Sequence, residues 1–341
     1  MGIGFGKAIR GSASLLPAAL LRPLGRPAAV FFHGVERRLD DSRVQSNHHD
    51  AAEFSAIARA LKDNFDVLPL SELGRVLAAP ERHPHALFLM ADDGYANNLS
   101  EAAVILSEFN LPWTLFLSTW HIDTHAPNPV FVARLFCLFA PDAKYEIANL
   151  GVLSLGSDRR FVAEQTIARL RALDAPRADQ AVAEMAAALG EARLAQLLAR
   201  FRSDSFLTWN EVAALKARGV EIGAHAHKHW PMHAAQSPGY LRDQAALPRA
   251  RIEAELGVPC RYFAYPFGNT ADVCRAAWQA VRDAGYGHAF TTLSGSLDAS
   301  ANPFLMPRYG LQPRETRLAS LVPALRMGNG RLRDWQADLS R

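Results

Sequence analysis

Carboxylate and imidazole side chains follow two apolar stretches of this sequence, at the points where those stretches end. Two adjacent carboxylates, Asp92 and Asp93, come directly after residues 86–91, and three histidines come after residues 220–224. One carboxylate with two imidazoles is a common ligand set for a catalytic divalent metal, and a spare carboxylate beside it can act as a base. The sequence therefore indicates a hydrolytic metal centre.

The three histidines are His225, His227 and His229, and their spacing leaves two arrangements open. His225 and His229 stand four residues apart, so one turn of helix or a tight loop can present both to a single ion. If the strand continues instead, alternation places all three histidines on one face. Three histidines within five residues are more typical of a metal site than of a solvated surface.

Two further strand-like runs end at residues that could take part in catalysis. Residues 29–33 end on His33, and residues 262–266 lead into the turn signature Tyr-Pro-Phe-Gly at 265–268. Parallel α/β barrels build their active sites at the carboxyl ends of their strands, so these groups are expected to meet there. The His-His-Asp sequence at 48–50 also resembles a metal cluster, but its polar surroundings predict a loop without a catalytic role.

Strand and helix patterns alternate along most of the chain. Strands are predicted at eight places: 29–33, 65–70, 86–90, 113–118, 220–224, 262–266, 287–292 and 304–308. Helical stripes lie between them, as in Glu53–Leu61, where apolar residues recur at i, i+3, i+4 and i+7. Thr208 and Glu211 have the spacing of a helix capping box. We therefore expect an α/β fold, a distorted barrel of seven or eight parallel strands.

One region breaks this alternation. Residues 125–205 contain few strand signals, and residues 159–201 are rich in Ala, Leu and Arg, which predicts two or three helices. We expect a helical insertion that either covers the barrel or acts as a lid or specificity element. The expected organisation is a catalytic barrel at 28–311, preceded by an N-terminal extension at 1–27 and followed by a C-terminal helix and tail at 312–341.

The bulk composition is that of a soluble globular protein, with 49% hydrophobic and 21% charged residues. The formal net charge is only +3, and no run of five basic residues occurs, so no nucleic-acid partner is expected. The three cysteines, Cys137, Cys260 and Cys274, include no C-x-x-C pair, which argues against a disulfide framework or a cysteine zinc site. A reducing compartment is the simpler expectation.

The N-terminal residues 1–27 have some features of a targeting or membrane-surface segment. Lys7 and Arg10 precede a short apolar run at 12–21, but this run contains Pro17 and no clear small-x-small cleavage site follows it. No segment reaches the length of about 18 apolar residues that a membrane-spanning helix needs. We expect a cytoplasmic protein, with peripheral membrane association through an interfacial helix as an option and secretion or a periplasmic location as the less favoured alternative.

Taken together and in this order, the motifs resemble those of the polysaccharide deacetylase family, the metal-dependent carbohydrate N-deacetylases. Met-Ala-Asp-Asp-Gly at 90–94 is similar to the family's first motif, usually Thr-Phe-Asp-Asp-Gly. His-Ala-His-Lys-His at 225–229 is similar to the second, His-Ser/Thr-x-x-His, and Phe-Ala-Tyr-Pro-Phe-Gly at 263–268 is similar to the third. The resemblance extends from about residue 28 to residue 311 and is poor in the 125–205 insertion.

This resemblance implies a role for each motif residue. The implied ligands of a divalent metal, with Zn²⁺ as the expected ion, are Asp93, His225 and His229. Asp92 is implied as the general base, and Phe267 as the residue whose backbone N–H stabilises the oxyanion. His227 is then not a ligand. The implied substrate is an acylated amino sugar, and the implied activity is hydrolysis of its N-acetyl or N-formyl amide.

The sequence departs from the family pattern at several positions. Met90 replaces the first motif's threonine, and Ala226 replaces a hydroxyl residue that would brace the ligand loop. Ala264 stands where many members carry an arginine next to the base. The late Leu-x-His that usually brings the general acid is absent, because no histidine follows His288. Some members instead carry a histidine after the first strand, which makes His33 the candidate acid.

Three readings of function stay open at this stage. The substrate can be a glycan, or a lipid-linked or nucleotide-linked saccharide, and a cytoplasmic location favours a small or lipid-linked precursor over a finished polymer. The second reading is an allantoinase-like hydrolase of a non-sugar amide. The third is a catalytically dead carbohydrate-binding relative, against which the intact Asp92, Asp93, His225 and His229 argue.

Overall fold

Eight parallel strands form the main sheet of the computed structural model, which describes residues 26–156, 158–313, 335 and 339. The strand order is β11-β10-β9-β6-β5-β1-β12, with β4 also paired to β5. The strands of this sheet are β1 (Ala28–Phe32), β4 (Asp66–Val67), β5 (Ala86–Ala91), β6 (Thr114–Leu117), β9 (Glu221–Ala224), β10 (Tyr262–Ala264), β11 (His288–Phe290) and β12 (Tyr309–Gly310).

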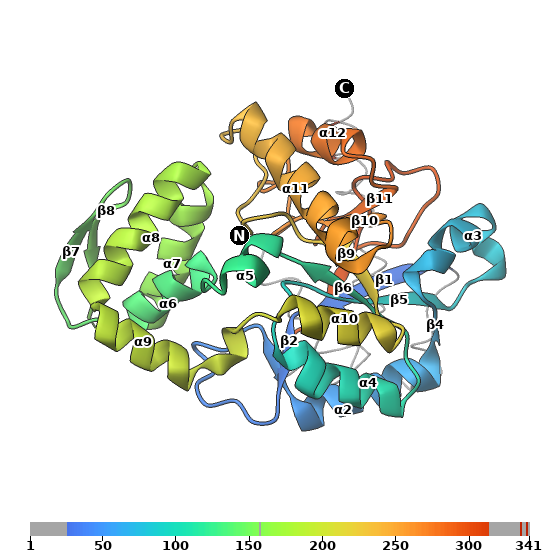
Figure 1. Cartoon of the computed structure of the whole chain (residues 1–341), viewed down its shortest axis with the longest axis horizontal. Helices are drawn as coiled ribbons and strands as arrows, with labels where there is room; N and C mark the ends of the chain where they lie inside the picture. The colour runs from blue at the N-terminus through green and yellow to red at the C-terminus, as the bar shows by residue number, and fades with distance from the viewer. Residues whose placement is uncertain (1–25, 157, 314–334, 336–338, 340–341) are drawn as a thin grey trace, which may run out of the picture.

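Helices surround the sheet, with α2, α4 and α10 along one side and α11 and α12 along another (Figure 1). The helices of this barrel part are α2 (Ala51–Asn64), α3 (Leu73–Ala78), α4 (Ala103–Glu108), α5 (Thr119–Thr124), α10 (Trp209–Ala217), α11 (Pro238–Leu256) and α12 (Arg275–Asp283). The single-turn segments are the 3-10 helices η2 (Leu70–Glu72), η3 (Pro80–Arg82) and η5 (Arg202–Asp204) and the π-helix η4 (Asn98–Ala102). The predicted capping box of Thr208 and Glu211 is present at the start of α10.

Side chains of the central strands alternate between two apolar clusters. In β5, Leu87 and Leu89 belong to the cluster under the helices, whereas Phe88 and Met90 belong to a cluster inside the curled sheet. Every residue of β1 and β5 is buried, which explains their unbroken apolar sequences. The predicted distorted barrel of seven or eight parallel strands is therefore confirmed.

A short segment near the end of the described chain connects the two edges of the curled sheet, β11 and β1. Met306 bridges Phe290 of β11, and Tyr309 pairs with Val30 of β1. The strand predicted at 304–308 is wrong in position, because Pro307 has no N–H to continue a ladder and the regular pairing begins only at β12. The strand predicted at 65–70 is likewise shortened to β4, because Pro69 interrupts it.

The strand ends that carry the predicted site residues lie level with one another. Phe32 is the register partner of Ala91, and Leu117 is the partner of Ala224. The residues that follow these pairs therefore leave the sheet at the same edge. This register places the first two motifs and His33 at one mouth of the barrel.

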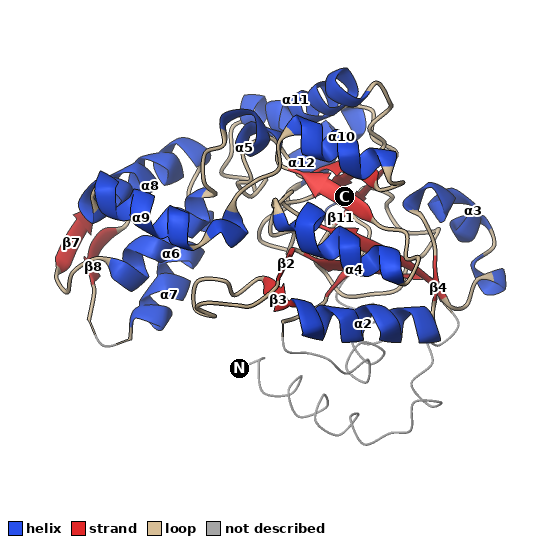
Figure 2. Cartoon of the chain, turned by 60° about the horizontal axis from the view of Figure 1, so that its bottom comes forward, coloured by secondary structure: helices blue, strands red, loops and turns tan. Residues whose placement is uncertain are grey.

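Residues 125–205 form the expected insertion, which lies beside the barrel at the left of Figure 1 and has its own apolar cluster. Its elements are α6 (Pro129–Phe139), β7 (Lys144–Ile147), β8 (Gly151–Ser154), α7 (Arg159–Arg171), α8 (Ala175–Leu189) and α9 (Glu191–Arg200). The antiparallel hairpin of β7 and β8 departs from the expectation of helices alone. In the view of Figure 2 this hairpin stands at the outer end of the insertion, away from the barrel.

The His-His-Asp sequence at 48–50 is a strand, not the predicted loop. It forms β3 (His48–Asp50), which pairs with β2 (Gly34–Glu36), and both histidines are buried. Their Nε2 atoms lie 3.1 Å from the carbonyl oxygens of Ser203 and Leu311, and such partners allow an imidazole to be buried without a metal.

The expected N-terminal extension lies outside the described residues up to residue 25, and so does most of the expected C-terminal helix and tail. Within the described part of the chain, no helix combines the length and apolarity that crossing a bilayer requires.

Candidate active site

Asp93, His225 and His229 meet at the mouth of the barrel. The Nε2 atoms of His229 and His225 lie 2.8 and 3.3 Å from the same oxygen, Asp93 Oδ1. In the described part of the chain, this is the one group of three metal-ligating side chains whose donor atoms all lie within 4.8 Å of one another. All three side chains are buried. The structure therefore brings together the three ligands that the resemblance implied.

The donor atoms of this cluster fit a divalent ion such as Zn²⁺. His225 Nδ1 lies 2.8 Å from the carbonyl oxygen of Ala264, so this nitrogen carries the proton and Nε2 keeps a lone pair for a metal. Asp93 Oδ1 is buried without a well-directed hydrogen bond. Burial raises the pKa of Asp93, but the adjacent imidazoles of His229 and His225 outweigh it and hold that pKa well below its usual value. An ionised carboxylate with imidazole donors is a ligand set that Zn²⁺ accepts.

Left-handed backbone conformations concentrate in the three motifs. Among the described residues, seven non-glycine residues have a positive φ, and four of them lie in the motifs. These four are Asp93 (76°), Ala226 (58°), His229 (57°) and Phe267 (59°). Such conformations cost on the order of 1 kcal/mol or more each and persist where the surroundings fix them, which is typical of functional sites.

Hydrogen bonds from two neighbouring elements hold the ligand loop in this conformation. The Ser118 hydroxyl, directly after β6, donates to the His225 carbonyl oxygen at 2.9 Å. In α11, Gln244 Oε1 accepts from the backbone N–H groups of His227 and Lys228 at 3.0 and 2.7 Å. The bracing hydroxyl that the sequence lacks at Ala226 is thus supplied by Ser118.

Asp92 is held by a buried arginine that the sequence analysis did not identify. Arg308 donates from both terminal nitrogens to the two Asp92 oxygens, each at 2.8 Å, and its guanidinium lies 4.3 Å from the Phe31 ring centroid. Burial raises the pKa of Asp92, but the adjacent Arg308 charge lowers it below its usual value. Asp92 is therefore paired with an arginine although position 264 provides none. Its only sequence signal is an arginine inside a strand-like apolar run.

His33 and Phe267 line the same cavity as Asp93, His225 and His229. His33 directly follows β1, and the neighbouring Asp92 N–H donates to the Phe32 carbonyl oxygen at 3.0 Å. Burial lowers the pKa of His33 against the opposing pull of Asp93 and Asp92. In the third motif, the Thr292 hydroxyl donates to the Phe267 carbonyl oxygen at 2.5 Å. The Phe267 N–H has no partner among the described residues and is free to donate.

One cavity of about 420 Å³ contains the whole constellation. The predicted site residues that line it are His33, Asp92, Asp93, His225, His229 and Phe267. His227 does not line this cavity, and its Nδ1 lies 2.9 Å from the Thr119 hydroxyl. A volume of this size is typical of pockets that enclose a small organic ligand.

The insertion forms one wall of this cavity, so it does more than cover the barrel. Asn128, the N-cap of α6, places its side-chain nitrogen 3.2 Å from His229 Nδ1. From α7, the Arg171 guanidinium lies 4.3 Å from the Phe267 ring centroid and forms an ion pair with Asp272 at 2.6 Å. No linear motif marks these residues, because their approach depends on how the insertion packs against the barrel.

The chain is similar to a known protein family and to several solved structures. A family model described as polysaccharide deacetylase matches residues 79–289. The Streptococcus pyogenes deacetylase PplD in complex with acetate has 14% identity and a TM-score of 0.58, covering 88% of this chain and 98% of that one. IcaB from Ammonifex degensii has 16% identity and a TM-score of 0.54, covering 87% and 97%. A de-N-acetylase from Aggregatibacter actinomycetemcomitans has 17% identity and a TM-score of 0.53, covering 88% and 100%. At these identities the likeness is one of fold, and no curated protein matches the sequence.

Proposed function

This chain belongs to the polysaccharide deacetylase family, and from that premise we propose that it is a metal-dependent hydrolase that removes an N-acetyl or N-formyl group from an amino sugar. The observation that supports this most directly is the convergence of Asp93, His225 and His229 beside an ionised Asp92 held by Arg308. We take Zn²⁺ as the ion. The proposed substrate is a glycan, or a lipid-linked or nucleotide-linked saccharide, used in making cell-surface polysaccharide.

The residues of the cavity divide the work of amide hydrolysis between them. Asp93, His225 and His229 would hold a divalent ion, which would polarise the acyl carbonyl and make a water molecule more acidic. Asp92 takes the proton from the attacking water, and Arg308 keeps the carboxylate ionised and oriented for this. The Phe267 N–H donates to the oxygen that becomes negative in the tetrahedral intermediate. His33 gives a proton to the leaving nitrogen, so the products are a carboxylic acid and a free amino sugar.

The experiment that tests this function measures metal content and amine release on the same preparation. The full chain is assayed against N-acetylated and N-formylated sugars, with allantoin as a non-sugar amide. We expect about one divalent metal per chain and amine release from at least one sugar, both lost in Asp93→Ala. Metal binding without amine release from any sugar contradicts the proposal and favours a carbohydrate-binding relative, whereas turnover of allantoin alone favours a non-sugar amidase.

A further inference from the structure

One face of α6 lies along the active-site cavity. Val130, Phe131 and Arg134, which are spaced to share a helix face, all line the cavity, and the N-cap Asn128 contacts His229. Arg134 follows Asn128 by six positions, or about 9 Å along a helix axis. Arg134 therefore lines the cavity farther along α6 than the contact of Asn128 with His229.

Arg134 differs from the other arginines of the cavity in its partners. Arg308 is paired with Asp92 and Arg171 with Asp272, but within the described residues no carboxylate oxygen lies within 4.0 Å of the Arg134 guanidinium. Its Nη1 instead donates to the carbonyl oxygen of Arg43 at 3.2 Å. A guanidinium stays charged in proteins, and a partly buried charge without a counter-ion is unfavourable.

Asp204, an acidic group of the same cavity whose charge acts on Arg134, does not neutralise it fully. Asp204 also lines the cavity, and its Oδ2 accepts a hydrogen bond from the Ser203 hydroxyl at 2.9 Å. Burial raises the pKa of Asp204 to about 7, although the Ser203 hydrogen bond and the Arg134 charge pull it down. At neutral pH this carboxyl is therefore ionised only in part.

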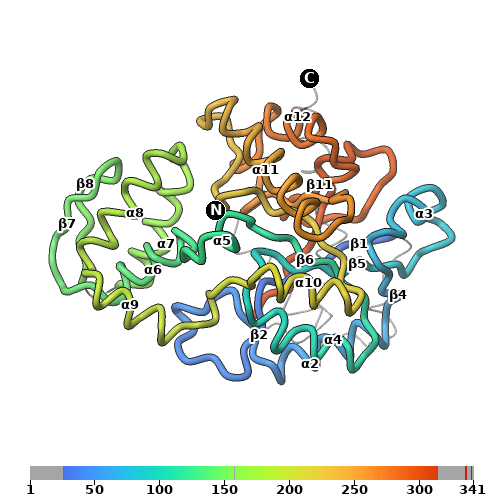
Figure 3. Tube along the Cα trace, viewed as in Figure 1, coloured from blue at the N-terminus to red at the C-terminus, as the bar shows by residue number. Residues whose placement is uncertain are grey.

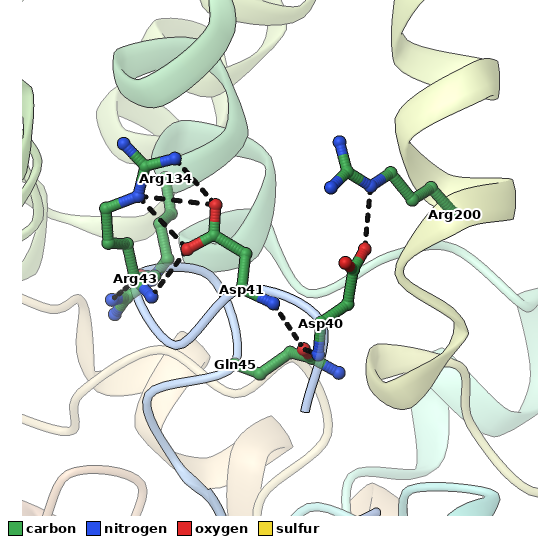
Figure 4. A network of polar contacts seen from close by, with 6 residues as sticks. All are labelled: Asp40, Asp41, Arg43, Gln45, Arg134 and Arg200. Atoms are coloured by element: carbon green, nitrogen blue, oxygen red, sulfur yellow. Dashed lines mark hydrogen bonds and ion pairs between the residues drawn. The ribbon is translucent and has the colours of Figure 1, made fainter. Parts of the chain in front are cut away.

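The loop at 37–47, between β2 and β3, fixes Arg134 at the cavity wall. Figure 4 shows Arg134 beside this loop, whose Asp40 forms an ion pair with Arg200 of α9 at 2.7 Å. Gln45 Oε1 accepts from the backbone N–H groups of Asp40 and Asp41 and keeps the loop folded. In Figure 3 the loop reaches from the barrel to the end of α9.

The same loop adds neutral polar groups to the cavity. Ser46 and Asn47 line it beside Arg134 and offer a hydroxyl and an amide. A planar guanidinium presents paired N–H donors that match the two oxygens of a carboxylate or phosphate. The wall thus offers a fixed cation and neutral polar groups in the same cavity as the metal ligands.

We propose that Arg134, with Ser46 and Asn47, forms an anion subsite that binds a carboxylate or phosphate group of the substrate near the acylated amino group. The inference rests on the proposed function and specifies its substrate class as an anionic saccharide. A phosphate can come from a sugar-phosphate linkage and a carboxylate from an adjacent uronic acid, so the test includes both.

The test compares anionic and neutral substrates on one enzyme preparation. The sugars are methyl N-acetylglucosaminide, N-acetylglucosamine 1-phosphate and a disaccharide of N-acetylglucosamine with glucuronic acid. We expect kcat/KM to be higher for one of the anionic sugars. Arg134→Gln should reduce that anionic-to-neutral ratio about 10- to 100-fold, because hydrogen bonds to charged groups have this strength. The ratio of kcat/KM for two substrates, measured on one preparation, does not depend on how much of the variant is folded.

Two further variants serve as a charge test and a control. Arg134→Lys should keep part of the ratio, and Arg160→Ala, which breaks an exposed ion pair with Glu164 outside the cavity, should keep all of it. Equal kcat/KM for neutral and anionic sugars in the unmodified enzyme, or an unchanged ratio in Arg134→Gln, overturns the subsite while leaving the deacetylase function intact.

If no sugar is hydrolysed, the proposed function fails and a binding measurement decides the subsite alone. Inorganic phosphate is titrated calorimetrically into Asp93→Ala, which removes a metal ligand, and into Asp93→Ala with Arg134→Gln. Binding to the first protein that is at least tenfold weaker in the second supports the subsite. Equal affinity, or no binding to either, refutes it.

Discussion

Substitution of Arg308 by methionine removes the guanidinium that holds Asp92 and keeps an apolar side chain in the space beside Phe31. Two hydrogen bonds of 2.8 Å are lost. Since burial alone raises the pKa of Asp92 and the Arg308 charge lowers it, the pKa of Asp92 must rise in this variant. We expect the acidic limb of the kcat/KM profile to move to higher pH.

The stability of the variant should depend on pH with a definite sign. In the unmodified protein the pKa of Asp92 is below its unfolded value of about 4, so the pair stabilises the fold above that pH and loses this effect as pH falls. In Arg308→Met the folded pKa of Asp92 is higher than in the unmodified protein, so less of this stabilisation remains. The loss relative to the unmodified protein should reach about 3–5 kcal/mol at pH 7, the usual effect of breaking a buried pair, and should decrease at pH 4, vanishing only below the folded pKa of Asp92 in the unmodified protein.

A second substitution tests whether an arginine placed at another position can replace the Arg308 charge next to Asp92. Ala264 lies in the same internal cluster as Met90, at the position where many family members carry the arginine. Ala264→Arg in the Arg308→Met background should return the acidic limb toward its original pH. It should also restore part of the activity, of which a positioned base contributes about 10²–10⁴-fold.

The assays are urea unfolding at pH 4 and pH 7 and kcat/KM as a function of pH. Arg160→Ala is the control, because it breaks an exposed ion pair with Glu164 and should change stability by no more than about 0.5 kcal/mol. An Arg308→Met enzyme that loses activity with an unshifted acidic limb would refute the role assigned to Arg308 and leave it a purely structural one.

The remaining predictions concern the metal, a buried acid and the proton donor. His229→Ala should lose the divalent metal and His227→Ala should keep it, and elemental analysis that finds equal loss in both would show that the wrong histidine pair was chosen. Asp204→Asn should raise the free energy of unfolding at pH 8 by up to about 4 kcal/mol and leave it unchanged near pH 4, because a folded pKa of about 7 makes stability fall between these values; urea titrations at the two pH values check this. His33→Ala should lower kcat for the amide about 10²–10⁴-fold and recover partly with an activated ester, and full amide hydrolysis by this variant would exclude His33 as the acid.

The convergence of the three motifs could be predicted because it depends on local sequence and on one general rule. Parallel strands end at one edge of a sheet, and the register of Phe32 with Ala91 and of Leu117 with Ala224 keeps these ends level. A side chain that directly follows such a strand therefore has little freedom in where it lies. The apolar runs at β1 and β5 were enough to define these ends.

Residues whose positions depend on long-range packing could not be predicted in this way. Arg308 reaches Asp92 across 216 positions of sequence, through a segment that changes its strand partner at Pro307. His48 was assigned to a loop because its neighbours are polar, yet a carbonyl 155 residues away satisfies its ring. Polar partners that far away convert a polar stretch into a buried strand, and composition does not reveal them.

Residues of the insertion contact His229 and its neighbour Trp230. These contacts give the insertion a role in holding the metal-ligand loop. Trp230, next to His229, packs in the apolar cluster of the insertion, and its Nε1 donates to Asp179 of α8 at 2.7 Å. Asn128, the N-cap of α6, also contacts His229. The left-handed His229 backbone needs such constraints to persist. A segment that only covered the barrel could be removed without effect on the site, whereas removal of this one would free a metal ligand as well as open the cavity.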